Sequence, residues 1–384
     1  MTTHELTAEF DIAESGILPL STRELLSFEP PQERERLLET LLDTSLGYSE
    51  ASGSLALRSA LAETYRGEEG DSRPCEPENI LVTTGAIEAN FLLLNVLLDP
   101  GDHVVAVNPA YQQLNSLPRA IGCDLSLWKV GRDDGGYTFD LDELERLVRS
   151  RARSRTRLIL INTPHNPTGA VLSPEELRRV YELAESVGAW VLCDEAYRWL
   201  EVPGEEPLAR PVYELGESGI SVGTLSKPFG LPGLRTGWMA APAAVVRECW
   251  RMRDYTSLSP GKLNDALAVL ALRHREKIFA RNREILAENL SAAGGWFEER
   301  REYLSWVSPR GGLLALMRYH GLPISSLELA DRLSGERGVM LAPGSAFGFE
   351  GHLRIGLGQR PDIFAEGLRR AGELLDELHR KYQG

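Results

Sequence analysis

The chain has 384 residues, of which 42% are hydrophobic and 26% charged, a composition typical of a globular protein with room for two domains. Its formal net charge of -14 argues against a nucleic-acid partner, because nucleic-acid binding needs a basic face. No apolar run approaches the length of a membrane span and the polar N-terminus lacks the apolar core of a signal peptide, so we expect a cytoplasmic protein with no membrane partner.

The first part of the chain alternates short apolar runs with helical patterns. Apolar runs without polar alternation are typical of strands covered on both faces, and they occur at residues 80–83, 103–107, 158–161, 190–193 and 220–223. Between them, residues 139–149 and 173–187 predict helices, and the second begins with the capping-box pattern Ser173-Pro-Glu-Glu176. This alternation predicts a mostly parallel sheet between helices.

From about Pro260 the pattern changes. Residues 263–293 and 363–381 predict long helices, and residues 312–317 and 352–357 predict shorter strands. We therefore predict a large domain over residues 45–262 and a small α+β domain formed by residues 1–44 together with residues 263–384.

The residues after each predicted strand are candidates for a ligand site, because open α/β sheets bind ligands beyond the carboxyl ends of their strands. Gly85 follows the first strand and opens a helix, whose free N–H groups and dipole favour a phosphate; the alternative is an ordinary turn. Tyr111, after the second strand, is either a stacking surface for a flat ligand or an ordinary aromatic residue. After the third strand, two X-Pro steps hold Asn166 in a stiff turn.

Ionisable residues follow the fourth and fifth strands. Asp194 comes directly after an apolar run, and a carboxylate buried there needs a cationic partner, which could be a ligand. Lys227 lies in a turn-rich stretch near Thr224, Ser226 and Arg235, which are all suited to phosphate binding. Lysine, unlike arginine, can lose its proton, and only five of the 42 basic residues are lysines, so Lys227 is the candidate for covalent chemistry.

Together these residues predict a phosphate cradle, a stacking aromatic ring, an isolated carboxylate and a lysine at one edge of the sheet. Pyridoxal 5′-phosphate (PLP) needs all four, because its aldehyde condenses with a lysine, its pyridine nitrogen is held protonated by a carboxylate, its ring stacks and its phosphate needs donors. The cysteines form no Cys-x-x-Cys pair or cluster with histidine, so the sequence predicts no metal site.

The chain resembles the class I and II aminotransferases, PLP-dependent enzymes of fold type I. The resemblance rests on the motifs "TGAIEAN", "NPAY", "NTPHNPTG", "DEAY", "TLSKPFGLPGLRTGW" and "HLRIGLG", in the family's order and spacing from about Tyr48 to Arg354. It implies an α/β fold with a large PLP-binding domain, built on a mixed, mostly parallel sheet between helices, and a smaller α+β domain.

The resemblance also implies roles for single residues. Lys227 corresponds to the Schiff-base lysine, Asp194 to the partner of the pyridine nitrogen, and Tyr111 to the aromatic residue that stacks on the ring. Asn166 and Tyr197 correspond to the pair that hydrogen-bonds the phenolic oxygen of the cofactor.

The resemblance assigns three further functions. The phosphate cradle corresponds to Gly85, Ala86, Thr224 and Arg235, with Ser226 close by. Tyr48 corresponds to a tyrosine that reaches the phosphate of the neighbouring subunit, which implies a homodimer with shared active sites. Arg354 corresponds to the arginine that binds the substrate α-carboxylate, and its planar fork suits a bidentate contact.

The N-terminal segment departs from the family pattern. Many members carry a Gly-x-Pro segment that closes over the substrate, whereas Gly16 has no proline two residues later. This resembles a subgroup that acts on arginine or hydroxyarginine and includes capreomycidine synthase and PLP-dependent arginine oxidases. Glu14, or else Glu9 or Asp11, would then meet a guanidinium; the alternative is an ordinary solvated acidic segment.

We therefore expect an aminotransferase that moves the amino group of an L-amino acid to a 2-oxo acid through a lysine Schiff base and pyridoxamine phosphate. The alternative is a PLP-dependent cyclase, lyase or oxidase acting on arginine or a hydroxyarginine-like substrate. A PLP-sensing domain of a transcription regulator is disfavoured, because the chain shows neither the charge nor the spare length for a DNA-binding domain.

Overall fold

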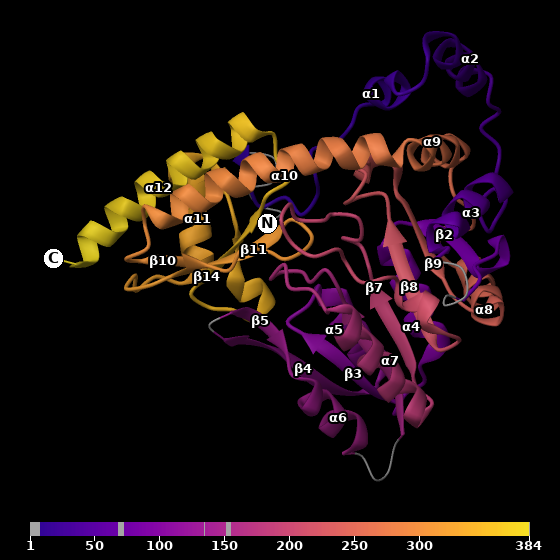
Figure 1. The fold of residues 1–384 in the computed structure, drawn as a ribbon, viewed down its shortest axis with the longest axis horizontal. Coiled ribbons are helices and arrows are strands. Elements are labelled where there is room, and N and C mark those ends of the chain that lie inside the picture. Colours follow the sequence, from indigo (N-terminus) through magenta and orange to yellow (C-terminus); the bar gives the residue numbers. More distant parts are fainter. Residues whose placement is uncertain (1–7, 68–72, 134, 151–154, 384) are drawn as a thin grey trace.

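The protein contains one large and one small β-sheet, each packed against helices (Figure 1). The structure is a computed structural model that describes residues 8–67, 73–133, 135–150 and 155–383. No helix among these residues combines the length and the apolar character needed to cross a membrane.

The large sheet has eight strands in the order β2-β9-β8-β7-β6-β3-β4-β5. These are β2 (Ile80–Thr84), β3 (His103–Asn108), β4 (Asp124–Asp133), β5 (Gly136–Phe139), β6 (Thr156–Asn162), β7 (Trp190–Asp194), β8 (Gly219–Thr224) and β9 (Thr236–Ala240). Strands β4, β3, β6, β7 and β8 pair in parallel, β9 is antiparallel to β8 and β2, and β5 is antiparallel to β4. The carboxyl ends of β2, β3, β6, β7 and β8 therefore lie at one edge, and the predicted mostly parallel sheet is confirmed.

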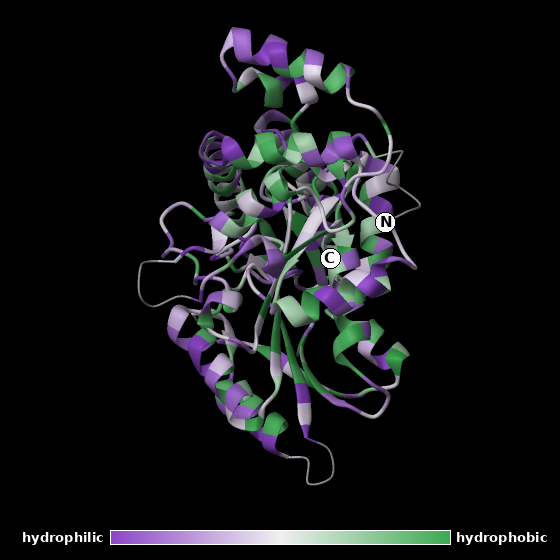
Figure 2. Cartoon of the chain, turned by 90° about the vertical axis from the view of Figure 1, so that its right-hand side faces the viewer, coloured by the Kyte–Doolittle hydropathy of each residue, from purple (hydrophilic) through white to green (hydrophobic). Residues whose placement is uncertain are grey.

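Apolar side chains cover both faces of this sheet. On β2, Leu81 belongs to one buried cluster, whereas Ile80 and Val82 belong to another. Because successive side chains of a strand point to opposite faces, helices cover both sides. The sheet strands are correspondingly green in Figure 2, while the helices mix green and purple.

Five helices contribute to the cluster around Leu81: α4 (Ala86–Leu97), α5 (Gln112–Ile121), α6 (Leu141–Arg149), α7 (Pro174–Val187) and α8 (Ala243–Arg253). The cluster around Ile80 includes residues of α1 (Thr22–Ser27), α3 (Leu55–Ala62) and α9 (Lys262–Arg273). One more helix, α2 (Pro31–Leu42), buries no residue.

The small sheet has the order β10-β11-β14-β13 and is antiparallel. Its strands are β10 (Leu304–Trp306), β11 (Leu314–Tyr319), β13 (Ala342–Pro343) and β14 (His352–Gly356). Residues of three helices pack with it in one apolar cluster: α10 (Arg275–Glu298), α11 (Ser326–Arg337) and α12 (Pro361–Gln383). Beside it, β1 (Phe10–Asp11) pairs in parallel with β12 (Val339–Met340).

The N-terminal residues divide between the apolar clusters. Phe10, Ile12 and Ile17 pack in the cluster of the small sheet, whereas Leu25 and Leu26 pack with α3 and α9. The domain boundaries, 45–262 and 1–44 together with 263–384, stay a prediction.

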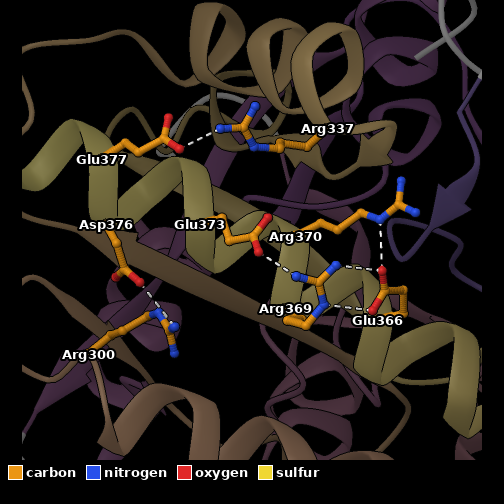
Figure 3. Close-up of polar contacts among 8 residues, drawn as sticks. All are labelled: Arg300, Arg337, Glu366, Arg369, Arg370, Glu373, Asp376 and Glu377. Carbon is orange, nitrogen blue, oxygen red and sulfur yellow. Dashed lines mark hydrogen bonds and ion pairs between the residues drawn. The ribbon is translucent and has the colours of Figure 1, made fainter.

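Ion pairs line the side of α12 shown in Figure 3, where Arg369 binds Glu366 and Glu373. Arg370 binds Glu366 and also donates to Glu9 at 2.8 Å. Water screens such exposed pairs, so each stabilises the fold only slightly. Glu9 therefore pairs with Arg370 of α12 in this structure, and the hypothesis that it meets a substrate guanidinium stays a prediction.

Two secondary-structure predictions need correction, and one strand was missed. The expected helix over residues 263–293 is two helices, α9 and α10, separated by His274. Phe139 belongs to β5, because α6 begins only after its N-cap Asp140, whose carboxylate accepts two backbone hydrogen bonds. Strand β9 was not predicted, since its residues lie within the turn-rich motif after Lys227.

Candidate active site

A cavity of about 330 Å³ opens at the carboxyl edge of the large sheet. Its wall brings together most of the predicted site residues: Gly85, Ala86, Tyr111, Asn166, Asp194, Tyr197, Thr224, Ser226, Lys227 and Arg235. Three polar residues that were not predicted also line it: Ser15, Asn90 and Asn162. Tyr48, Gly16 and Arg354 are not part of the wall.

One end of the cavity is built from hydrogen-bond donors. Gly85 has a φ of 78° and precedes α4, whose first backbone N–H groups have no partner within the helix. A side chain at Gly85 would come within 2.8 Å of Arg235 Nη2, so glycine permits this close approach. The Thr224 hydroxyl accepts from the Ser226 N–H at 3.1 Å, which fixes the two hydroxyl groups side by side. This donor set suits a phosphate.

Asp194 is the last residue of β7 and is buried. Its Oδ2 accepts from Asn90 Nδ2 at 2.8 Å, and its Oδ1 accepts from the Ala196 N–H at 3.1 Å. Burial raises the pKa of Asp194, while these two hydrogen bonds and the charge of Lys227 oppose the shift. The carboxylate is thus held in one orientation, and it favours a cationic partner.

Asparagine side chains fix the turn around Asp194. Asn162 Nδ2 donates to the Asp194 carbonyl at 2.8 Å, and Asn162 Oδ1 accepts from the Asn166 N–H at 2.8 Å. Asn90 could have been noticed in the sequence as a polar residue among the apolar residues of the helix that follows Gly85. Its partner could not, because 104 residues separate it from Asp194.

Lys227 lies directly beyond β8, and its amine meets the N-terminal segment. Lys227 Nζ donates to Ser15 Oγ at 2.7 Å and lies 3.6 Å from Glu14 Oε1. Burial lowers the pKa of the Lys227 amine, Arg354 and Arg235 add to this effect, and the Glu14 carboxylate opposes it. The neutral amine needed for nucleophilic attack is therefore more accessible than in water.

Arg354 lies on β14 of the small sheet and contacts Asn166, which lines the cavity. Its Nη1 donates to Asn166 Oδ1 at 3.1 Å and its Nη2 donates to the Ala13 carbonyl at 2.9 Å. Its Nε is buried and finds no hydrogen-bond partner among the described residues. A buried donor of this kind fits an anionic ligand such as a carboxylate.

The remaining predicted residues differ in their positions. Gly16 packs on the stem of Lys227, since a Cβ there would lie 3.9 Å from Lys227 Cδ. Tyr197 is buried, and burial raises its pKa, so the phenol stays protonated. Tyr111 is 42% exposed at the cavity wall, whereas Tyr48 is 81% exposed and lies away from the cavity of its own chain.

The family description "Aminotransferase class I and II" matches residues 15–365. The chain belongs to this family. It is 33% identical over 357 residues to a capreomycidine synthase of Streptomyces vinaceus, covering 93% of this chain and 87% of the relative. It is 28% identical to an arginine–pyruvate transaminase of Pseudomonas aeruginosa, covering 88% and 86% of the two chains.

Two solved structures share the whole fold. A PLP-dependent aminotransferase from Streptococcus suis superposes with a TM-score of 0.88 at 35% identity, covering 98% of this chain and 96% of that one. The PLP-dependent cyclase OrfR superposes with a TM-score of 0.85 at 31% identity, covering 98% and 95%. The protein therefore has the fold of the fold type I PLP enzymes, and PLP is its cofactor.

The residues of the cavity fit this cofactor. The donor set at Gly85, Thr224, Ser226 and Arg235 suits the phosphate, and the oriented Asp194 carboxylate suits a protonated pyridine nitrogen. The desolvated Lys227 amine suits the aldehyde.

A second buried carboxyl group, Glu195, follows Asp194 but does not line the cavity. Its Oε1 accepts from Ser221 Oγ at 2.7 Å and from the Val212 N–H at 2.9 Å. Burial raises the pKa of Glu195 from its ordinary value near 4.5 to about 7, although the Arg198 charge opposes the shift. The group therefore titrates near neutral pH.

Glu195 should make the stability of the protein depend on pH. Its folded pKa lies above its unfolded value, so its stabilising contribution is complete below about pH 4.5 and is lost as the pH rises through about 7. Glu195→Gln has no proton to lose, so its free energy of unfolding should fall less than that of the wild type between pH 5 and 8. Urea denaturation at several pH values measures this, with exposed Glu206→Gln as the control. Parallel curves for Glu195→Gln and the wild type would contradict the assignment.

Proposed function

We propose that the protein is an aminotransferase that moves the amino group of an L-amino acid to a 2-oxo acid. The observation that carries the proposal is the convergence of the Lys227 amine and the Asp194 carboxylate in one cavity, with the Arg354 guanidinium joined to the cavity wall through Asn166. An α-amino acid carries a carboxylate beside the carbon that reacts, so it needs a base and an anion site a short distance apart. Membership of the aminotransferase family supports the same reaction.

Bound PLP supplies an electron-withdrawing ring that stabilises negative charge on the substrate Cα. Asp194 would keep the ring nitrogen protonated, because Asn90 and Ala196 hold the carboxylate in a fixed orientation. The protonated Tyr197 phenol and the Asn166 amide would donate hydrogen bonds to the phenolic oxygen of bound PLP. These contacts would orient the ring.

Arg354 binds the substrate carboxylate through its unpartnered N–H and orients Cα over Lys227. The neutral Lys227 amine then takes the proton from Cα: the C–H bond breaks, an N–H bond forms and the electron pair stays with the substrate carbon. Return of this proton to a neighbouring carbon is one step of the transfer; hydrolysis then releases a 2-oxo acid, and the reverse sequence with a second 2-oxo acid completes it.

A second candidate function is a cyclase, lyase or oxidase that acts on arginine or a hydroxyarginine-like substrate. The observation that favours it is Glu14, whose carboxylate is 55% exposed and lies 3.6 Å from Lys227 Nζ. A carboxylate at this distance from the reacting amine suits a substrate with a cationic side chain. The names of two relatives, capreomycidine synthase and arginine–pyruvate transaminase, are compatible with such a substrate but differ in the reaction.

We also propose that the protein acts as a homodimer with shared active sites. Helix α2 extends from the body of the protein (Figure 1) and has no buried residue; large apolar residues are exposed at its end and elsewhere on the chain: Leu42, Leu46, Tyr48, Leu55 and Tyr255. Such a surface is typical of an interface. Ser49 Oγ donates to the Pro260 carbonyl, which joins the segments of Tyr48 and Tyr255 in one surface. A second copy would cover this surface and receive Tyr48 at its phosphate.

Lys227→Ala should remove both the absorbance of the lysine-bound cofactor and the activity, because no other lysine lines the cavity. Exposed Lys129→Ala is the matched control and should keep both. Spectra of the purified holoenzymes and activity assays measure the two effects. If Lys227→Ala keeps the lysine-linked absorbance, the assignment of the site is wrong.

The amino donor and the reaction type can be tested on the holoenzyme with single L-amino acids and no 2-oxo acid. An aminotransferase should convert its cofactor stoichiometrically to the amine form, whereas repeated release of ammonia or peroxide from arginine would favour the second candidate. If Glu14 binds a guanidinium, Glu14→Gln should raise KM for arginine about tenfold, the loss of one charged hydrogen bond, and leave KM for a neutral donor unchanged. Equal effects on both donors would exclude this contact.

Mixed dimers test the shared site. Lys227→Ala and Tyr48→Ala subunits should each be impaired alone, but their heterodimer contains one site with both the intact lysine and the intact tyrosine. Random mixing should restore about a quarter of the wild-type activity. If Tyr48 acts within its own chain, mixing should restore nothing beyond the activity of the Tyr48→Ala subunits.

A further inference from the structure

The Lys227 amine is held by a polar segment near the N-terminus, which contains Glu14 and Ser15. Ser15 Oγ is its hydrogen-bond acceptor at 2.7 Å, and Glu14 Oε1 is its nearest carboxylate oxygen at 3.6 Å. Ser15 also lines the cofactor cavity, so its hydroxyl lies between the N-terminal segment and the reacting groups. None of the roles assigned above to the site residues accounts for this hydroxyl.

The same hydroxyl reaches a second site residue. Ser15 makes a side-chain hydrogen bond with Tyr197, and this bond lowers the pKa of the phenol against the larger raising effect of burial. The Ser15 hydroxyl thus interacts both with the Lys227 amine, from which it accepts at 2.7 Å, and with the Tyr197 phenol.

The backbone around Ser15 is fixed on both sides. The Gly356 N–H donates to the Ile12 carbonyl at 2.9 Å, and the Leu18 N–H donates to the Gly358 carbonyl at 2.6 Å. A side chain at Gly356 would overlap the Glu14 carbonyl, and one at Gly358 would overlap the Gly16 carbonyl, so both glycines allow this close approach. Ser15 is thus presented to Lys227 by a backbone that is anchored to β14 and to the residues just after it.

We propose that Ser15 is a positioning residue that holds the Lys227 amine at the cavity wall, with Glu14 as the counter-charge of the amine. After Lys227 takes a proton from the substrate Cα, the new ammonium donates to Ser15 and is stabilised by Glu14. The amine therefore returns its proton from a fixed position. The inference rests on PLP chemistry at Lys227 and holds for transamination and for the second candidate function alike.

The test compares Ser15→Ala, Ser15→Thr and the remote, exposed Ser186→Ala as holoenzymes. The first measurement is the pH titration of the absorbance of the lysine-bound cofactor. Loss of the acceptor should favour loss of the proton in Ser15→Ala and lower the midpoint by about half a pH unit, a roughly threefold change in the proton equilibrium. Glu14→Gln should shift the midpoint in the same direction, while Ser15→Thr and Ser186→Ala should keep the wild-type midpoint.

The second measurement is the rate with a fixed amino acid. Ser15→Ala should lower kcat about tenfold with KM within about twofold, because the hydroxyl acts on the proton transfer and not on the binding of the carboxylate. Ser15→Thr should recover most of the rate. A wild-type midpoint together with a wild-type kcat in Ser15→Ala would overturn the inference. All variants should keep the absorbance of the lysine-bound cofactor, which shows that the PLP site is assembled. A negative result for Ser15 can therefore be told apart from a wrong assignment of the protein as a PLP enzyme.

Discussion

Burial of charge is the constraint on which this site depends. Water is largely excluded around Asp194, Lys227 and Arg354, and burial disfavours the charged form of each: it raises the pKa of the acid and lowers the pKa of the two bases. An unpaired buried charge is costly, so each group needs specific partners. Those partners lie on α4, on the N-terminal segment and on the turn after β6. The need to bring these segments together explains why the two sheets meet at the cavity.

The N-terminal segment illustrates the consequence. It lies between the sheets, where the Ala13 carbonyl accepts from Arg354 and the Ser15 hydroxyl accepts from Lys227. Within one short segment, Ala13 therefore contacts Arg354, the proposed carboxylate-binding group, and Ser15 contacts Lys227, the proposed proton-transfer group. Any shift of the segment would change both contacts, which links substrate binding to proton transfer through the backbone.

Much of this arrangement was predictable, because local patterns place the main groups. Apolar runs predicted the strands that carry Asp194 and Lys227, and Gly85 at a strand–helix turn predicted the phosphate end. Contacts between distant parts of the chain left no local signal: Asn90 beneath Asp194, Ser15 at Lys227, and Glu9 on α12. Strand β9 also left no clear sequence signal. It is antiparallel to both neighbours, and it contains Gly237, whose lack of a side chain permits close packing on Gly85.

The distance between Glu14 and Lys227 relates substrate choice to the charge of the lysine. A carboxylate 3.6 Å from the amine favours the ammonium form, which cannot take a proton. A cationic side chain placed at the same carboxylate would compensate its charge and leave more of the lysine in the neutral form that can take a proton, whereas a neutral side chain would not. One Coulomb interaction would then serve both recognition and proton transfer. Its strength depends on the exclusion of water, because the same pair in bulk solvent would be screened.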